Sequence, residues 1–200
     1  SRQLRIGADH PEPLPGSPTR VHRSIRIDAA ENDLPVTIRA VISNEAEAYG
    51  LQRASRVGIE TRILSHRDYP DRKSYDQALG DLIASFQPRL VALAGFMRIL
   101  SPELVQRFQG RMLNIHPSLL PDFPGLDTHA RALAAGRRLH GASVHFVSNE
   151  LDSGPVVLQA EIPVLPGDTE DILANRVLQQ EHIIYPMAIA WYIDGRLSIN

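Results

Sequence analysis

Leu90-Val91-Ala92-Leu93-Ala94 is an unbroken run of apolar residues near the middle of the chain. A strand at the centre of a parallel sheet is covered by helices on both faces, so its residues are apolar one after another instead of alternating with polar ones. The run therefore predicts a central strand of a parallel sheet.

The segments before this run alternate between strand and helix patterns. We expect strands over residues 36–43 and 60–64, and helices over residues 45–57 and 74–86. Gly58 follows the first helix, at a position where glycine often ends a helix. The second helix has apolar side chains at helical spacing, which we expect to face the core: Tyr75, Leu79, Leu82, Ile83 and Phe86.

The segments after the run continue the alternation. We expect strands over residues 112–115, 142–147 and 156–164, and helices over residues 102–108, 128–135 and 169–192. Pro186 lies inside the last helix and is expected to kink or break it. The alternation predicts the α/β class, as an open, mostly parallel twisted sheet with helices on both faces.

Two short stretches carry polar groups suited to acyl transfer: Asn114-Ile115-His116-Pro117-Ser118-Leu119-Leu120-Pro121 and Leu151-Asp152-Ser153-Gly154-Pro155. Asn114 can donate to an oxygen that becomes negatively charged, and His116 can exchange a proton near neutral pH. Asp152 can hold that imidazole in its charged form. Together these three residues predict transfer of a one-carbon acyl group without a metal or a covalent intermediate.

The position of Asn114 and His116 supports this interpretation. They end a predicted strand, and the carboxyl ends of strands form the edge at which open α/β sheets bind ligands. Two residues apart on an extended segment, their side chains point to the same face. Each residue also has a structural alternative: His116 as a hydrogen-bonded core or turn histidine, Asn114 as a turn cap, and Asp152 as an Asx turn.

The same stretches resemble the formyltransferases that use 10-formyltetrahydrofolate. Residues 114–121, with their continuation Asp122-Phe123-Pro124-Gly125-Leu126-Asp127-Thr128-His129, are similar to the signature of that family. Three flanking stretches are similar as well: Ala94-Gly95-Phe96-Met97-Arg98-Ile99-Leu100-Ser101-Pro102, His140-Gly141-Ala142-Ser143-Val144-His145-Phe146-Val147 and Gln180-Glu181-His182-Ile183-Ile184-Tyr185-Pro186. The likeness runs from about residue 36 to residue 200 and is greatest to the branch that formylates glycinamide ribonucleotide.

The resemblance implies a role for each matching residue. It makes Asn114, His116 and Asp152 the catalytic residues, and it implies 10-formyltetrahydrofolate and glycinamide ribonucleotide as small-molecule substrates. The residues that it places at the folate are Arg72, Met97, Arg98, Ile99, Leu100, Asn114, Ser148, Asn149, Glu150, Leu151 and Asp152. It places Glu181 at the ribonucleotide. Without the resemblance, residues 97–100 would be core, Arg72 a solvated charge and Glu181 an ordinary helical carboxylate.

The composition fits a protein that acts on small molecules. The 200 residues, 43% of them apolar, can bury one substantial core, and the net charge of −2 gives no sign of a nucleic-acid or lipid partner. The chain has no cysteine, which excludes disulfides and thiolate ligands, and no histidine spacing indicates a metal. The sequence has no apolar run long enough to span a membrane and no signal-peptide core, so we expect a cytoplasmic protein. We expect it to be a monomer or a homodimer.

We expect a single domain over residues 1–200, with a Rossmann-like half at 34–100 and a catalytic, folate-binding half at 101–200. Residues 1–33 are anomalous, because prolines cluster early in them and no strand or helix periodicity appears through residue 28. We expect irregular chain there.

The anomaly concerns phosphate binding. The glycinamide ribonucleotide branch of this family begins with a strand and a Gly-x-Gly-Ser-Asn loop that binds the substrate phosphate. Counting back without gaps from Asn44 places that loop at Ser17-Pro18-Thr19-Arg20-Val21, which has no glycine. Three explanations are open: a displaced reading frame, which we favour, a divergent terminus, or a phosphate site built from Arg20, His22 or Arg23.

Three rival functions share the motif. A 10-formyltetrahydrofolate hydrolase would use the same three residues with water as acceptor, although such enzymes usually carry a further N-terminal domain. Methionyl-tRNA formyltransferase needs a further nucleic-acid-binding domain and a basic surface. We expect neither addition in these 200 residues. A folate-binding protein without transfer activity would follow from the missing phosphate loop.

Overall fold

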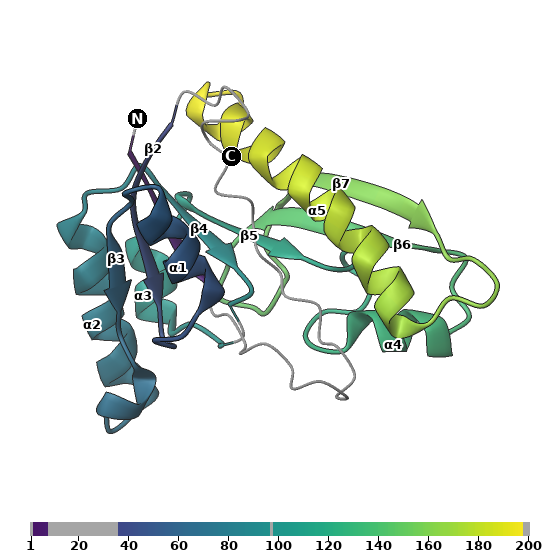
Figure 1. Cartoon of the computed structure of the whole chain (residues 1–200), viewed down its shortest axis with the longest axis horizontal. Helices are drawn as coiled ribbons and strands as arrows, with labels where there is room; N and C mark the ends of the chain where they lie inside the picture. The colour runs from purple at the N-terminus through teal and green to yellow at the C-terminus, as the bar shows by residue number, and fades with distance from the viewer. Residues whose placement is uncertain (1, 8–35, 97, 198–200) are drawn as a thin grey trace.

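The computed structural model describes residues 2–7, 36–96 and 98–197, which form one sheet flanked by helices (Figure 1). The strands are β1 (Arg2–Gly7), β2 (Thr37–Ser43), β3 (Thr61–Ile63), β4 (Leu90–Ala94), β5 (Met112–His116), β6 (Leu139–Phe146) and β7 (Val156–Pro163). The helices are α1 (Tyr49–Arg56), α2 (Arg72–Ser85), α3 (Pro102–Arg107), α4 (Thr128–Ala134) and α5 (Glu170–Ile193), with a short 3₁₀ turn η1 (His66–Asp68).

The sheet is open and mostly parallel, as the sequence predicts. Its strand order is β3-β2-β1-β4-β5-β6-β7, so the direction of winding reverses between β1 and β4. β1 to β5 pair in parallel, whereas β6 and β7 join as antiparallel strands. Every residue of β4 is buried, which confirms the central strand predicted from its unbroken apolar run.

Helices cover both faces of the sheet. Leu90 and Ala92 of β4 pack in the cluster that contains α5, whereas Val91 and Leu93 pack with α2 and α3 on the opposite face. α1 packs on Val41 of β2, which shares the α5 face. Met112 of β5 packs on the face covered by α2 and α3. Because side chains alternate along a strand, Asn114 and His116 point to that same face.

The N-terminal segment differs from the sequence prediction. Residues 2–7 were expected to be irregular, but they form β1, an inner strand paired with β2 on one side and with β4 on the other. Main-chain pairing with two neighbours fixes this strand where side-chain periodicity gives too weak a signal. The expected phosphate-loop position at residues 17–21, and the alternative residues Arg20, His22 and Arg23, lie outside the described residues.

Two helix predictions also need correction. α1 begins at Tyr49 rather than at residue 45, because Ala48 has an extended backbone conformation and the Ser43 hydroxyl accepts from the main chain of Glu45. α5 contains Pro186 but continues as one helix to Ile193, so the expected break is wrong, and the kink stays a prediction. Pro186 is buried, and the packing of apolar residues of this helix on the sheet offsets the lost main-chain hydrogen bond.

Tyr185 ties α5 to the strands that lead to Asn114. Its side chain is fully buried, and its hydroxyl lies 2.8 Å from the carbonyl oxygen of Leu93 and 3.0 Å from that of Leu113. Leu93 is the residue paired with Asn114 at the end of the β4–β5 ladder. The hydroxyl therefore holds two neighbouring strands at the point where their pairing ends.

We expect Tyr185→Phe to lower the free energy of unfolding by about 1–2 kcal/mol, because two buried carbonyls lose a donor. Tyr192→Phe is the matched control, since its hydroxyl bonds the Arg89 carbonyl at 3.2 Å in an exposed setting and should cost less than about 0.5 kcal/mol. Urea unfolding followed by circular dichroism measures both values. Equal losses of unfolding free energy in the two variants would contradict the role assigned to the Tyr185 hydroxyl.

Candidate active site

The register of β5 and β6 brings the predicted site residues together with a histidine. Asn114 lies directly opposite His145, and His116 lies opposite Ser143. Residues paired in this way project to the same face of a sheet. The Asn114 amide nitrogen lies 3.2 Å from the Nε2 atom of His145. β5 ends at His116, which confirms that both predicted residues lie at the carboxyl end of a strand.

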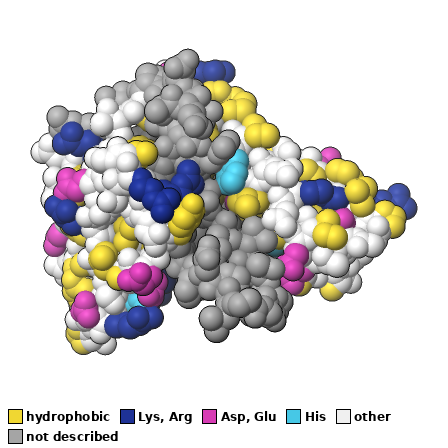
Figure 2. Space-filling view, viewed as in Figure 1, with side chains coloured by type: hydrophobic (Ala, Val, Ile, Leu, Met, Phe, Trp, Pro, Cys, Tyr) yellow, Lys and Arg dark blue, Asp and Glu magenta, His cyan; other side chains and the backbone are white. Residues whose placement is uncertain are grey.

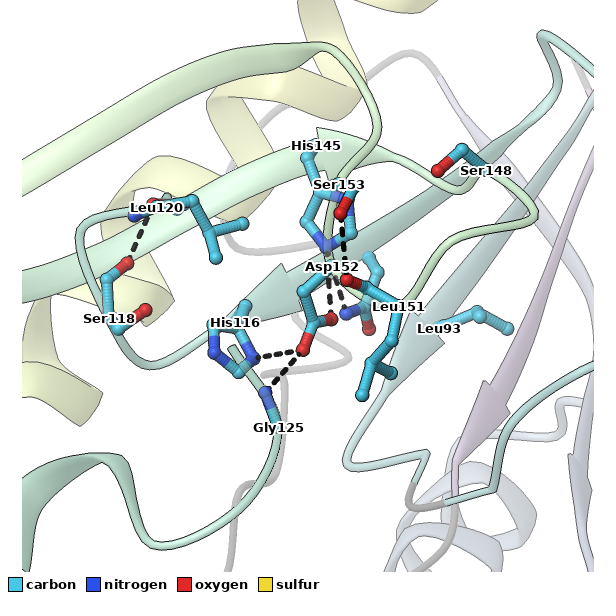
Figure 3. Close-up of polar contacts among 12 residues, drawn as sticks. Leu93, His116, Ser118, Leu120, Gly125, His145, Ser148, Leu151, Asp152 and Ser153 are labelled. Carbon is cyan, nitrogen blue, oxygen red and sulfur yellow. Dashed lines mark hydrogen bonds and ion pairs between the residues drawn. The ribbon is translucent and has the colours of Figure 1, made fainter. Parts of the chain in front are cut away.

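Asp152 occupies the centre of the site, between two imidazole rings (Figure 3). Its Oδ2 atom lies 3.4 Å from Nδ1 of His116, and its Oδ1 atom lies 3.6 Å from Nε2 of His145. The main-chain N–H of Gly125 donates to Oδ2 at 2.9 Å. The side chains of His116, His145 and Asp152 are 7%, 3% and 9% exposed, so water screens their charges little. The structure thus brings Asp152 to His116, as the sequence predicts.

His145 has a defined tautomer in this arrangement. Its Nδ1 lies 2.9 Å from the carbonyl oxygen of Phe146, which can only accept, so Nδ1 carries the hydrogen. In the neutral ring Nε2 then accepts from the Asn114 amide. Burial lowers the pKa of His145, although the Phe146 carbonyl and the Asp152 carboxylate oppose that shift. A neutral His145 therefore orients the Asn114 amide with its nitrogen toward the ring.

His116 faces oxygen atoms with both of its ring nitrogens. Nε2 lies 2.9 Å from the carbonyl oxygen of Phe123, and Nδ1 faces the carboxylate of Asp152. Both oxygens accept hydrogen bonds, so the doubly protonated ring can satisfy the two contacts together. This arrangement suits a group that gains a proton during a reaction and stabilises nearby negative charge.

A cleft of about 470 Å³, including its open mouth, lies beside this cluster. Leu93, Phe96 and Leu100 contribute apolar walls, and Asn114, His145 and Asp152 lie at its polar end. Apolar walls with a few polar groups at one end are typical of small-molecule sites. The Nε atom of Arg98 is buried at the cleft and has no hydrogen-bond partner among the described residues, and its guanidinium carbon lies 5.1 Å from the centre of the Tyr75 ring.

Most of the residues predicted to bind folate line this cleft: Arg98, Ile99, Leu100, Asn114, Ser148, Asn149, Glu150, Leu151 and Asp152. Met97 lies outside the described residues. Arg72 is exposed at the start of α2, and Glu181 is buried in α5. Neither Arg72 nor Glu181 is among the described residues that line the cleft, so their roles remain predictions.

His145 is the site residue that the sequence analysis did not single out. A signal for it exists, because His140, Ser143 and His145 are the polar residues of an otherwise apolar strand, and Ser143 and His145 lie two positions apart. Such spacing indicates one polar face on a buried strand. The contact with Asn114 could not be predicted, because it depends on how β6 pairs with β5.

Among residues 2–7, 36–96 and 98–197, no group of three or more His, Asp or Glu side chains is placed to hold a metal ion. Within the same residues, none of the helices combines the length and the apolar character needed to cross a membrane.

His129 and His140 form a second pair of buried histidines next to the site. Nδ1 of His129 lies 3.1 Å from Nε2 of His140, with the rings edge to face. Burial, and as a second cause the nearby His116, lower the pKa of His140 from its usual 6.5 to about 4. His140 is thus neutral in the folded protein at neutral pH.

Comparison with known proteins identifies the class to which this fold and site belong. The family model described as "Formyl transferase" matches residues 17–189. The chain therefore belongs to the formyl transferase family, and it is a formyltransferase enzyme. The match begins upstream of residue 36, so the likeness extends further toward the N-terminus than the sequence analysis indicated.

Particular relatives narrow the comparison. The chain is 53% identical over 175 residues to phosphoribosylglycinamide formyltransferase of Escherichia coli (strain K12), covering 87% of this chain and 82% of that protein. It is 44% identical over 163 residues to the human trifunctional purine biosynthetic protein adenosine-3, covering 82% of this chain and 16% of that protein. The crystal structure of glycinamide ribonucleotide transformylase 1 from Symbiobacterium toebii superposes with a TM-score of 0.88 at 38% identity, covering 99% of this chain and 90% of that one.

The lowered pKa of His140 predicts a pH dependence of stability. The unfolded chain takes up a proton at this residue below about pH 6.5, whereas the folded protein does so only near pH 4. Stability present at neutral pH is therefore lost as the pH falls through this window. Between pH 7 and pH 4.5 we expect the wild type to lose about 2 kcal/mol more than His140→Gln, measured by urea unfolding. Identical losses in both proteins would contradict the prediction.

Proposed function

We propose that the chain transfers the formyl group of 10-formyltetrahydrofolate to the amine of glycinamide ribonucleotide, as a step of purine biosynthesis. The names of the Escherichia coli and human relatives support this choice of acceptor and pathway. The observation that carries the proposal is the cluster itself, in which Asp152 contacts both His116 and His145 while His145 orients Asn114.

The cleft fits the folate co-substrate. A pteridine ring is flat and has polar edges, and the cleft combines the apolar side chains of Leu93 and Phe96 with the loop of residues 148–152. The buried Nε of Arg98, without a partner among the described residues, offers a donor to such a ligand. We assign the polar end of the cleft, at Asn114 and Asp152, to the formyl group.

Asn114 stabilises the charge that develops during transfer. The acceptor amine attacks the formyl carbon, so that a carbon–nitrogen bond forms and the carbonyl electrons move to oxygen. One Nδ2 hydrogen of Asn114 is directed to His145, and we assign the other to that oxygen. Protonated His116, the next residue on the same face of β5, places its positive charge near that oxygen, while its two N–H groups point to Phe123 and Asp152 in the resting site.

His116 and Asp152 manage the protons. The attacking amine must lose a proton, and the departing folate nitrogen must gain one when its bond to the formyl carbon breaks. His116 gives and regains a proton at Nε2, directly or through water, when this atom leaves the Phe123 carbonyl, while Asp152 stabilises the charged ring at Nδ1 across 3.4 Å. No covalent acyl-enzyme is needed, and two bound substrates replace a bimolecular encounter.

The partners we propose are small molecules. On the face shown in Figure 2, the basic and acidic side chains of the described residues are interspersed, rather than collected in one basic patch. Nucleic-acid binding would call for such a patch. A cytoplasmic location and a monomeric or homodimeric state remain predictions of the sequence.

The experiment that tests this function measures release of the formyl group from a 10-formylfolate analogue by the purified chain, with and without glycinamide ribonucleotide. Release that depends on the ribonucleotide is the expected result. Release without it would replace the transferase by a hydrolase. Binding of the folate analogue without release would leave a folate-binding protein.

Replacing Asp152 by asparagine tests its charge. Asparagine keeps the shape and can still accept from Gly125, but it cannot stabilise a protonated His116. We expect kcat to fall about a hundredfold, with little change in the thermal midpoint. Asp81→Asn is the matched control, because Asp81 pairs with Arg107 on the surface of α2 and should leave kcat unchanged. Wild-type turnover by Asp152→Asn would remove Asp152 from the mechanism.

A further inference from the structure

Three polar side chains form a row across the antiparallel end of the sheet. His116 of β5 lies opposite Ser143 of β6, and Ser143 lies opposite Gln159 of β7. Directly paired residues project to one face, so the row shares the face of Asn114 and His145. Gln159 lies two strands away from His116 and belongs to no stretch discussed above as part of the site.

The row holds the segment that leaves β5 after His116. The Ser143 hydroxyl donates to the carbonyl of Ser118 at 2.6 Å and accepts from the N–H of Leu120 at 3.0 Å. The Gln159 amide nitrogen donates to the carbonyl of Leu120 at 2.9 Å and to the Ser143 hydroxyl at 2.8 Å. Both main-chain polar groups of Leu120 are therefore bonded to side chains of β6 and β7.

The same segment then supplies two of the atoms that surround the reacting groups. The Phe123 carbonyl faces Nε2 of His116 at 2.9 Å, and the Gly125 N–H donates to Asp152 at 2.9 Å. The Ser118 hydroxyl donates to the carbonyl of Asp122 at 2.6 Å, which stiffens the turn between Leu120 and Phe123. Figure 3 shows Ser118 and Leu120 on one side of His116 and Gly125 below it. A shift of Leu120 therefore moves both contacts.

We propose that Gln159 is a positioning residue of the formyl transfer site. Its amide fixes Leu120, and through residues 118–125 it holds the Phe123 carbonyl against His116 and the Gly125 N–H against Asp152. This inference rests on the proposed function for its effect on catalysis. The geometry of His116 depends on the Gln159 side chain whether or not the protein transfers formyl groups.

Other contacts keep the segment attached to the protein when Gln159 is changed. Arg131 of α4 donates to the carbonyls of Pro124 and Leu126, and Arg137 pairs with Asp122. These arginine contacts are solvent-exposed, so the arginine side chains can follow the segment when it shifts. Loss of the Gln159 amide then moves residues 118–125 relative to His116 and Asp152, while the protein stays folded.

Gln159→Glu is the sharpest test, because it keeps the length and shape of the side chain. It replaces the donating amide by an oxygen that repels the Leu120 carbonyl. We expect kcat for formyl transfer to fall about ten- to hundredfold, as small misplacements of reacting groups do, while KM for the folate analogue changes less than about twofold. Gln159→Ala removes the two bonds without repulsion and should show a smaller loss of the same kind.

The control variant is Gln109→Glu, which makes the same charge change on an exposed side chain after α3 and should behave as the wild type. A readout that needs no activity is the nuclear magnetic resonance signal of the His116 ring, assigned by its loss in His116→Gln. We expect this signal to shift in Gln159→Glu and to stay in place in Gln109→Glu.

Each outcome decides the proposal. An inactive wild type would overturn the proposed function, and the His116 signal would still test the positioning role. Wild-type kcat together with an unmoved His116 signal in Gln159→Glu would overturn the positioning role. So would a loss of kcat that only follows the fraction of unfolded protein, measured by the thermal midpoint.

Discussion

The buried carboxylate of Asp152 is the contact on which the rest of the site depends. It meets His116 from β5, His145 from β6 and the Gly125 N–H from the segment after β5, so that three parts of the chain converge on two oxygen atoms. A buried charge is costly unless it is hydrogen-bonded and paired, and the Gly125 N–H and the charged form of His116 supply those contacts, because a neutral His145 turns a lone pair toward the carboxylate. That cost restricts how the three parts can be arranged, and Asp152 itself takes a positive φ of 51° to reach its partners.

The architecture of the sheet explains why polar groups collect there. α5 covers the β5–β7 end of the sheet on one face, whereas α2 and α3 cover the other face near β4. On that second face, residues 117–127 lie over β5 and β6 in place of a helix, and their main-chain groups need partners. Ser143 and Gln159 bond the main chain of Ser118 and Leu120, and His116 and Asp152 face the main chain of Phe123 and Gly125. The contacts that hold residues 117–127 over the sheet are therefore also the contacts that build the site.

Much of this arrangement could be predicted from sequence, and the exceptions have physical causes. The continuous apolar run of β4 identified the parallel sheet, and the spacing of Asn114 and His116 on a strand placed both at its edge. His145 and Gln159 could not be assigned, because their contacts depend on the register of antiparallel strands that are distant in sequence. β1 was missed because pairing with two neighbours outweighs its side-chain pattern, and the continuity of α5 through Pro186 depends on burial against the sheet. These are tertiary effects that a local pattern does not contain.

The protonation state of His145 tests this account most directly, because Asn114 is oriented only by a ring that carries its hydrogen on Nδ1. Nitrogen-15 magnetic resonance of histidine-labelled protein at neutral pH, with the signal assigned by His145→Gln, reports both the charge and the tautomer. We predict a neutral ring with hydrogen on Nδ1. A charged ring, or a neutral ring with hydrogen on Nε2, would contradict the arrangement of Asn114, His145 and Asp152 described above.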